Sequence, residues 1–141
     1  VIVGFPGETE REFRDLMDFV KETRFERLGA FIYSAEEGSA ARAMKGQVPA
    51  KLKEERFHRL MSLQRRISTG IQKRSVGKAV RVLIDSKDES KKGLYYGRTE
   101  ADAPGVDGQV LVRSSGALRP GDFARVKITD AVEYDLIGET R

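Results

Sequence analysis

The chain has 141 residues, of which 39% are hydrophobic and 34% charged, a balance typical of a globular protein with one domain or two small ones. It contains no cysteine, so disulfides and thiolate metal sites are excluded from this sequence, and its single histidine, His58, cannot hold a metal by itself. No apolar run is long enough to cross a membrane and no signal peptide is visible. We therefore expect a cytoplasmic location and no membrane partner.

The net charge of +4 is divided unevenly along the chain. Residues 1–41 hold five basic and nine acidic residues, residues 42–75 hold ten and two, and residues 76–141 hold eleven of each. The first region is acidic, the second strongly basic and the third balanced. The basic region is explained either by a solvated helix face, the more common case, or by contact with RNA or an acidic surface.

The first residues predict a strand, a turn and a helix start. Val1–Val3 are β-branched and apolar, as in a parallel strand covered on both faces. Gly4 and Gly7 permit a sharp turn close to a ligand, and Thr9 with Glu12 fits a helix capping box. Such a turn either binds a ligand or simply connects the strand to the helix, and the pattern leaves both possibilities open.

A second strand is predicted at residues 27–33 and a long helix at about 49–74. The resulting strand–helix–strand–helix order implies a parallel strand pair with a right-handed crossover. Two strands do not make a stable sheet of this kind, and an apolar strand is already under way at residue 1. We therefore expect further strands upstream of this sequence.

The predicted long helix combines an apolar stripe with a basic surface, and Pro49 suits its first turn. The stripe consists of Leu52, Phe57, Leu60, Leu63, Ile67 and Ile71. The remaining surface is expected to carry Arg56, Arg59, Arg65, Arg66, Lys73 and Arg74.

Beyond Val76 the pattern changes to short runs of β-forming residues separated by turns rich in glycine, proline and aspartate. Five such strands within so few residues predict a small closed β-barrel of the OB type, which leaves no exposed edge. The runs lie at 80–85, 94–99, 109–113, 123–129 and 134–137. The expected core is Val82, Ile84, Val110, Val112, Val126 and Ile128.

Together with this barrel, the segments 4–9, 33–39 and 47–49 resemble the methylthiotransferase family of radical S-adenosylmethionine enzymes. The resemblance implies an α/β part followed by an all-β part. Residues 1–48 would be the last segments of a TIM-like barrel, residues 49–73 a linking basic helix, and residues 74–141 a TRAM domain.

The resemblance also implies cofactors. The whole enzyme would use S-adenosylmethionine and two 4Fe–4S clusters, and every cluster ligand would lie upstream because this chain has no thiol. The chain alone would then be inactive, with no catalytic or metal-binding residue of its own. By the same resemblance, Ile2, Val3 and Gly4 would contact the adenine part of S-adenosylmethionine.

Two branches of that family differ in substrate. One modifies an adenosine in transfer RNA, and the other methylthiolates the β-carbon of an aspartate in a small-subunit ribosomal protein. Residues 27–31, 101–108 and 134–139 resemble the second branch. Ala35 and Ser39 depart from the residues usual in their loop, although both replacements are small. A binding module without enzymatic role remains a third possibility.

The charge balance of residues 76–141 bears on this choice, because a domain that holds RNA needs surplus lysine and arginine. Asp102, Asp107, Asp122 and Asp135 instead offer carboxylates to a basic ribosomal protein, and RNA is the less favoured partner. The alternative is that these aspartates cap turns. Tyr95, Tyr96 and Phe123 either stack on bases or, as is more common in a small barrel, belong to its core.

Overall fold

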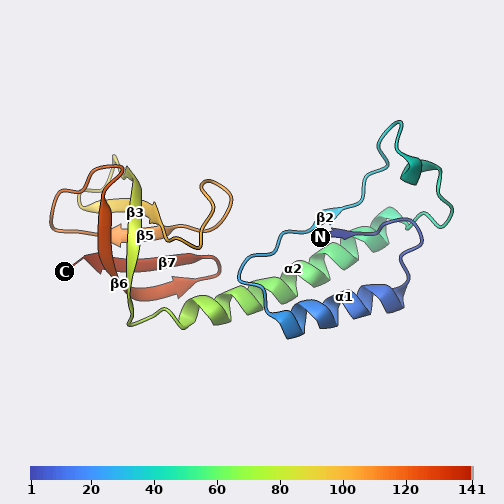
Figure 1. Ribbon diagram of the computed structural model, residues 1–141, viewed down its shortest axis with the longest axis horizontal. Coiled ribbons are helices and arrows are strands. Elements are labelled where there is room, and N and C mark those ends of the chain that lie inside the picture. The colour runs from blue at the N-terminus through green and yellow to red at the C-terminus, as the bar shows by residue number, and fades with distance from the viewer. Residues whose placement is uncertain (141) are drawn as a thin grey trace. The chain divides into compact units, whose positions relative to one another are not determined.

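The computed structural model describes residues 1–140. They form two compact units, with the boundary in the sequence between Ile67 and Ser68. The first unit, here called the helical unit, contains two short strands, one whole helix and most of a second helix (Figure 1). The second contains the end of the second helix and five strands. An α/β part is thus followed by an all-β part, as the sequence predicts.

Strands β1 (Ile2–Val3) and β2 (Phe31–Ile32) form a parallel pair, which confirms the predicted pairing. The ladder is only two residues long because Gly4, with a φ of 76°, turns the chain away after Val3. Val3 is fully buried, whereas Ile2 is 57% exposed and Phe31 71% exposed. In the described residues no third strand pairs with β1 or β2, so the expected cover by further strands stays a prediction.

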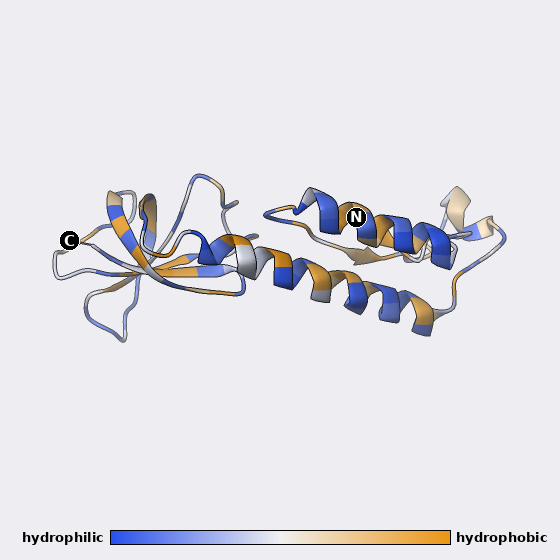
Figure 2. Cartoon of the chain, turned by 90° about the horizontal axis from the view of Figure 1, so that it is seen from below, coloured by the Kyte–Doolittle hydropathy of each residue, from blue (hydrophilic) through white to orange (hydrophobic). Residues whose placement is uncertain are grey.

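Helix α1 (Glu10–Thr23) begins with the predicted capping box and ends where Arg24 adopts a left-handed φ of 56°. A 3₁₀ turn, η1 (Ala40–Ala43), precedes helix α2 (Ala50–Lys73), whose bounds match the predicted long helix within one residue. Hydrophobic and hydrophilic residues alternate along both helices (Figure 2), as expected for amphipathic helices.

The five remaining strands close into a barrel in the order β3-β4-β5-β7-β6, which confirms the predicted five-stranded barrel. Strands β5 and β7 are parallel and every other neighbouring pair is antiparallel. Closure leaves each strand with two partners, so the sheet has no open edge. The strands are β3 (Ala79–Lys87), β4 (Leu94–Arg98), β5 (Val110–Arg113), β6 (Phe123–Val132) and β7 (Asp135–Thr140).

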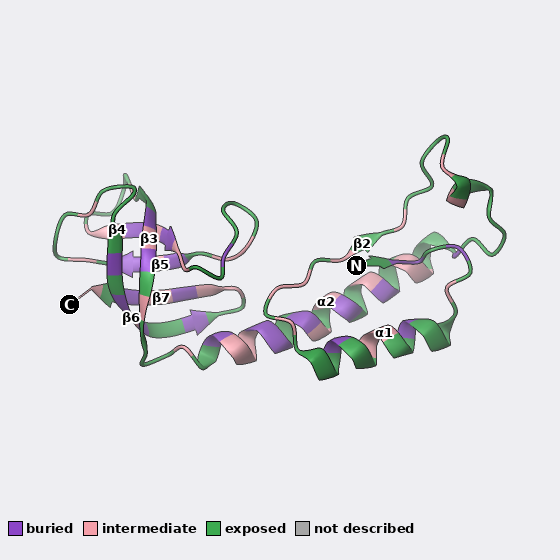
Figure 3. Cartoon of the chain, in the orientation of Figure 1, coloured by how far each residue is buried: buried purple, intermediate pink, exposed green. Residues whose placement is uncertain are grey.

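The barrel core contains all six residues predicted for it, each at most 1% exposed. They alternate with outward residues along β3, β5 and β6, so buried and exposed positions follow one another along these strands (Figure 3). The core also includes Tyr95, Ala124, Ala131 and Leu136.

The last turns of α2 belong to the barrel unit. Gln72 is buried there, and its side-chain amide donates a hydrogen bond of 2.8 Å to the carbonyl oxygen of Tyr134. The contacts of α2 therefore change from one unit to the other near Ser68, before the helix itself ends at Lys73.

Candidate functional site

The turn after β1 is held by backbone and carboxylate contacts. The amide of Gly4 donates to Oε2 of Glu8 over 3.0 Å, and the amide of Gly7 donates to the carbonyl of Gly46 over 2.8 Å. Both Gly4 and Gly7 have positive φ values, 76° and 88°, which favour glycine. The turn therefore has one defined shape. The carboxylate of Glu8 already occupies the place beside the Gly4 amide where an anionic ligand could otherwise bind.

Glu8 joins this turn to α2 through a buried ion pair. Nη1 of Arg56 lies 2.6 Å from Oε1 of Glu8 and also donates to the Glu8 carbonyl over 3.0 Å. The side chains are 2% and 12% exposed, respectively. The prediction that Arg56 belongs to the basic surface is therefore wrong, because its charge is matched by Glu8 inside the helical unit.

Two longer ion pairs to the more exposed Glu10 extend this contact. Nη2 of Arg56 lies 3.6 Å from Oε2 of Glu10, and Nη1 of Arg59 lies 3.2 Å from Oε1 of the same residue. Both guanidinium groups lie over the ring of the buried Phe13, at 5.5 and 4.8 Å from its centroid. The first turn of α1 is thus fixed to α2 by charge and by packing.

The capping box at the start of α1 is present as predicted. Oγ1 of Thr9 accepts from the Glu12 amide over 3.2 Å, and Oε2 of Glu12 accepts from the Thr9 amide over 2.7 Å. The hydrogen bond from the Thr9 amide, followed by that from its hydroxyl, lowers the pKa of Glu12. The helix start therefore supports the turn from its C-terminal side.

Sequence reasoning missed Lys53. Its Nζ donates to the carbonyl of Tyr33 over 3.1 Å and lies 4.8 Å from the centre of the Tyr33 ring. A Cβ at Gly4 would overlap Cγ of Lys53. Glycine is therefore required at position 4 because the backbone there lies close to the aliphatic part of the Lys53 side chain. The only signal in the sequence for this role of Lys53 is that it lies one helical turn before Arg56.

The four aspartates proposed for partner binding each accept a backbone hydrogen bond, three of them within a turn and Asp135 from a residue distant in sequence. Oδ2 of Asp102 accepts from Thr99 over 3.0 Å, and Oδ2 of Asp107 from Ala103 over 2.8 Å. Oδ2 of Asp122 and Oδ1 of Asp135 accept from the amides of Arg119 and Gln109 over 2.8 and 2.9 Å. The contacts of Asp102, Asp107 and Asp122 match the turn-capping alternative, whereas that of Asp135 joins the start of β7 to the residue before β5. In each aspartate the other oxygen can still contact a partner.

Only two of these aspartates lie together. Asp107 and Asp135 line one hollow beside β4, where Asp85 and Arg98 form an ion pair. Asp102 and Asp122 do not line that hollow, and Asp102 is only 9% exposed. The sequence-predicted set is therefore divided among separate turns.

The three barrel aromatics have three different environments. Tyr95 is 4% exposed and its hydroxyl accepts from the Leu118 amide over 3.2 Å, so the core prediction is confirmed for it. The Tyr96 hydroxyl donates to Oδ2 of Asp88 over 2.7 Å. Phe123 is 65% exposed, so the core prediction is wrong there, because it occupies the outward position before buried Ala124.

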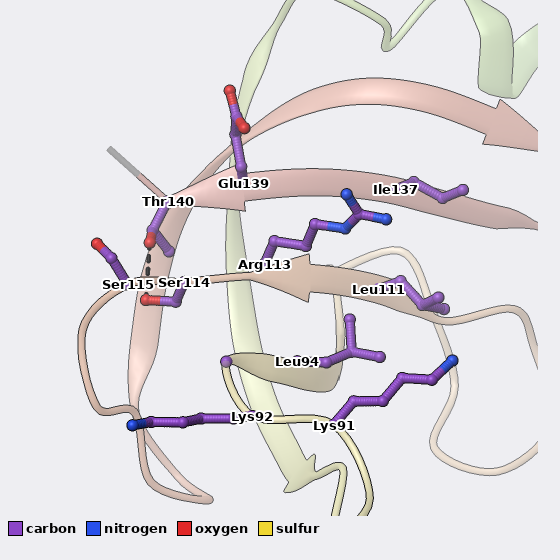
Figure 4. Close-up of a pocket in the computed structure, with 11 residues that line it drawn as sticks. Lys91, Lys92, Leu94, Leu111, Arg113, Ser114, Ser115, Ile137, Glu139 and Thr140 are labelled. Carbon is purple, nitrogen blue, oxygen red and sulfur yellow. Dashed lines mark hydrogen bonds between the residues drawn. The ribbon is translucent and has the colours of Figure 1, made fainter.

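A second hollow lies over β4, β5 and β7 (Figure 4). Leu94, Leu111 and Ile137 contribute apolar side chains to it, and its charged residues are Lys91, Lys92, Arg113 and Glu139. A hydrogen bond of 2.8 Å from Oγ1 of Thr140 to Oγ of Ser114 closes one end. Sequence reasoning did not select these residues, since they come from three separate strands and turns.

Within residues 1–140, no group of histidine, aspartate and glutamate side chains has the arrangement of a metal site. None of the helices in the same range is long and apolar enough to cross a membrane. The described residues therefore offer a shaped turn, an acidic hollow and cationic surfaces.

Comparison with known proteins shows what the chain is similar to. Residues 76–140 match the family model of the TRAM domain. The chain is 52% identical over 139 residues to the ribosomal protein uS12 methylthiotransferase RimO of Pelotomaculum thermopropionicum, which covers 99% of this chain. The chain is therefore similar to RimO proteins along nearly its whole length. The RimO protein of Desulforamulus reducens is 49% identical to the chain over 98% of its residues. That of Escherichia fergusonii is 48% identical over 97% of them.

The matches to RimO proteins include the helical unit as well as the barrel, since they extend over nearly every residue. They confirm the resemblance to the branch that acts on a ribosomal protein. The chain spans 31% of the length of the first two relatives and 30% of the third.

Proposed function

We propose that this chain is part of an enzyme that adds a methylthio group to the β-carbon of an aspartate in ribosomal protein uS12. The observation that carries the proposal is the 52% identity to a RimO protein over 99% of the chain. The enzyme would be a radical S-adenosylmethionine methylthiotransferase of the cytoplasm with two 4Fe–4S clusters. When bound, these groups supply the radical, the sulfur and the methyl group.

The residues of this chain do not fit the clusters. The sequence has no cysteine, and no other group of ligands in residues 1–140 has the arrangement of a metal site. Cluster ligands therefore belong to residues outside this sequence.

For S-adenosylmethionine the fit differs among the three proposed residues. Ile2 is 57% exposed and can pack against an adenine ring. Val3 is buried and its carbonyl accepts from Tyr33, while the Gly4 amide is occupied by Glu8. We propose that Ile2 makes the direct contact, and that Val3 and Gly4 hold it in place. The buried pair of Glu8 and Arg56 supports this role by fixing the turn.

We also propose that residues 1–48 are the last part of a larger barrel, that 49–73 link the domains and that 74–141 are the TRAM domain. The family match over 76–140 supports the last boundary. The exposed β1 and β2 side chains support the first, since a larger sheet would cover them.

The TRAM barrel is proposed to dock the basic substrate protein through Asp102, Asp107, Asp122 and Asp135. The support is strongest for Asp107 and Asp135, which line one acidic hollow with Asp85. A lysine or arginine of the substrate protein would pair with these carboxylates. Asp102 and Asp122 act mainly by holding the turns beside them.

The activity is tested with the longer protein that contains this chain, loaded with its clusters. We expect mass spectrometry to find a methylthio group on an aspartate of uS12 and none on the adenosine of a transfer RNA. Modification of the transfer RNA and not of uS12 would reverse the assignment to the RimO branch.

Docking is tested with the double variant Asp107→Asn and Asp135→Asn, because asparagine keeps an oxygen for the turn contacts. We expect uS12 affinity to fall at least about tenfold, since tenfold lies near the lower end of the coupling energies measured for close charge pairs at an interface. The variant Glu89→Gln with Glu100→Gln removes the same charge from exposed turns and serves as the control. Equal losses in both variants would mean that only overall charge matters.

A further inference from the structure

Lys53 of α2 contacts the ends of both strands of the helical unit. The aliphatic part of its side chain lies against the backbone of Gly4, the residue that follows β1. Its ammonium group donates a hydrogen bond of 3.1 Å to the carbonyl oxygen of Tyr33, the residue that follows β2. One side chain therefore connects the two points at which the strands stop.

The Tyr33 carbonyl is available for this contact because the ladder of β1 and β2 stops before it. The last hydrogen bond between the strands runs from the Tyr33 amide to the carbonyl of Val3, over 2.9 Å. In a longer parallel ladder the Tyr33 carbonyl would accept from the amide of Phe5, but Gly4 turns the chain away with a φ of 76°. The Lys53 ammonium thus replaces a strand partner that the turn removes.

The ring of Tyr33 adds two further contacts. Nζ of Lys53 lies 4.8 Å from the centre of this ring. The ring of Phe5 stands edge-on to it, with 5.3 Å between the two ring centres. Cation–π contacts and edge-to-face aromatic contacts are both attractive. Because Phe5 follows Gly4 directly, the turn after β1 is held to the end of β2 through Tyr33 as well as through Lys53.

The Lys53 ammonium has no acidic partner. Within residues 1–140 it contacts the carbonyl and the ring of Tyr33, and none of the ion pairs includes it. Arg56, one turn further along α2, is instead matched by Glu8. A backbone carbonyl binds an ammonium group through a charge-assisted hydrogen bond. Lys53 therefore holds the backbone in place and does not balance a carboxylate.

We propose that Lys53 is a positioning residue for S-adenosylmethionine. This rests on the proposed function, in which Ile2 contacts the adenine ring and Gly4 holds Ile2 in place. Lys53 fixes the backbone at Gly4 and the end of β2 together, so the strand that carries Ile2 keeps one position. Loss of the ammonium group would release the end of β2 and shift the surface that Ile2 presents to the adenine.

A positioning role and a purely structural role predict different kinetics. The adenine ring takes no part in the bond that breaks, so a contact with it is equally strong before and during the reaction. A poorer contact therefore raises the KM for S-adenosylmethionine and leaves kcat unchanged. A structural defect instead reduces the amount of folded enzyme, which lowers the apparent kcat at an unchanged KM.

The test uses the longer protein that contains this chain, loaded with its clusters. Lys53→Met keeps an unbranched apolar side chain beside Gly4 and removes the ammonium group. Calorimetry gives the dissociation constant of S-adenosylmethionine without turnover. We expect this constant and the KM to rise about tenfold and kcat to change less than about twofold, since a misplacement of about 1 Å can cost about 100-fold. The KM for uS12 should stay the same.

Lys51→Met is the matched control, because it removes the same charge from an exposed position of the same helix. It should leave the binding of S-adenosylmethionine unchanged. Lys53→Arg keeps a cation that can donate to the Tyr33 carbonyl, so it should restore most of the affinity. If Lys53→Arg binds no better than Lys53→Met, or if Lys51→Met loses as much affinity, the proposal is wrong.

The contact of Lys53 with Gly4 is tested by a double-mutant cycle of Gly4→Ala and Lys53→Ala. A Cβ at position 4 would overlap Cγ of Lys53, so Gly4→Ala should weaken S-adenosylmethionine binding less when Lys53 is already alanine. The strain from the positive φ of Gly4 is present in both backgrounds and cancels in the comparison. Equal effects in the two backgrounds would show that the lysine does not act through Gly4.

Failure of this proposal and failure of the proposed function give different results. If the unaltered protein binds S-adenosylmethionine and Lys53→Met binds it equally well, Lys53 is not a positioning residue and the proposed function stands. A lower kcat at an unchanged KM would mean that Lys53 only stabilises the fold, which also contradicts the proposal. If the unaltered, cluster-loaded protein does not bind S-adenosylmethionine, the proposed function itself fails.

Discussion

The barrel and the helical unit are held together by different interactions. The barrel core is a cluster of apolar side chains brought together by alternation along each strand. The helical unit closes its turn with a buried arginine, and its Glu8 partner is 48 residues away in sequence. Apolar packing tolerates small changes of shape, whereas a buried ion pair fails when either partner is removed. The part of the chain nearest the proposed cofactor contact is therefore the part most sensitive to a single charge.

The largest expected effect comes from breaking that pair. Arg56→Met leaves Glu8 buried without its partner, which should cost roughly 3–5 kcal/mol of stability in the helical unit. Hydrogen exchange should show loss of protection in α1 and in the turn, while β3 to β7 keep theirs. The barrel thus serves as an internal control within the same molecule.

Arg59→Met is the matched external control. Arg59 also pairs with Glu10, but its side chain is 42% exposed. Exposed pairs of this kind contribute about 0–1 kcal/mol. If both variants cost the same, the buried pair is not what holds the helical unit, and the contrast with the barrel disappears.

A smaller loss is expected from crowding the barrel wall. The Cβ of alanine at position 138 would lie 2.6 Å from the carbonyl oxygen of Lys127 on the adjacent strand. Gly138→Ala should therefore cost about 1–3 kcal/mol and lower the barrel melting temperature by roughly 4–8 °C per kcal/mol. At Gly116 the nearest atom would be 3.7 Å away, so Gly116→Ala should melt within a degree or two of the original chain. Equal melting of both variants would show that the wall relaxes around the added methyl group.

These differences explain which features could be predicted from the sequence. The barrel follows from local signals, because alternation along β3, β5 and β6 selects core positions and glycine-rich turns separate the strands. The capping box of α1 is equally local, since Thr9 and Glu12 are three residues apart. Local patterns of this kind require no knowledge of what packs against them.

The remaining features depend on partners distant in sequence. Arg56 has the spacing of a surface residue on α2, and only its contact with Glu8 shows that it is buried. Phe123 looks like a core aromatic until the register of β6 places it outward. The balanced charge of residues 76–141 likewise hides the opposed Arg81 and Arg125. The amino-acid composition gives only the net charge, whereas function depends on where the charges lie in the fold.

The smallest effect concerns a polar contact on the barrel surface. Hydrogen bonds from the Ser90 hydroxyl first, and then from the Tyr96 hydroxyl, lower the pKa of Asp88 from 3.8 to about 2. The same contact with Asp88 raises the pKa of Tyr96. Because the folded-state pKa of Asp88 lies below its unfolded value, its stabilising contribution is complete above pH 3.8 and is lost as the pH falls towards 2.

Carboxyl-carbon NMR of Asp88 should report this titration directly. Ser90→Ala should raise the pKa of Asp88 more than Tyr96→Phe does, because the Ser90 contact has the larger influence. In Asp88→Asn, the loss of stability between pH 3.8 and 2 should be smaller than in the original chain. An Asp88 that titrates near 3.8 in the folded protein would mean that its hydrogen bonds do not persist in solution. Unlike the pair at Glu8, this contact lies at the barrel surface and is only partly buried, so its loss should leave the barrel folded.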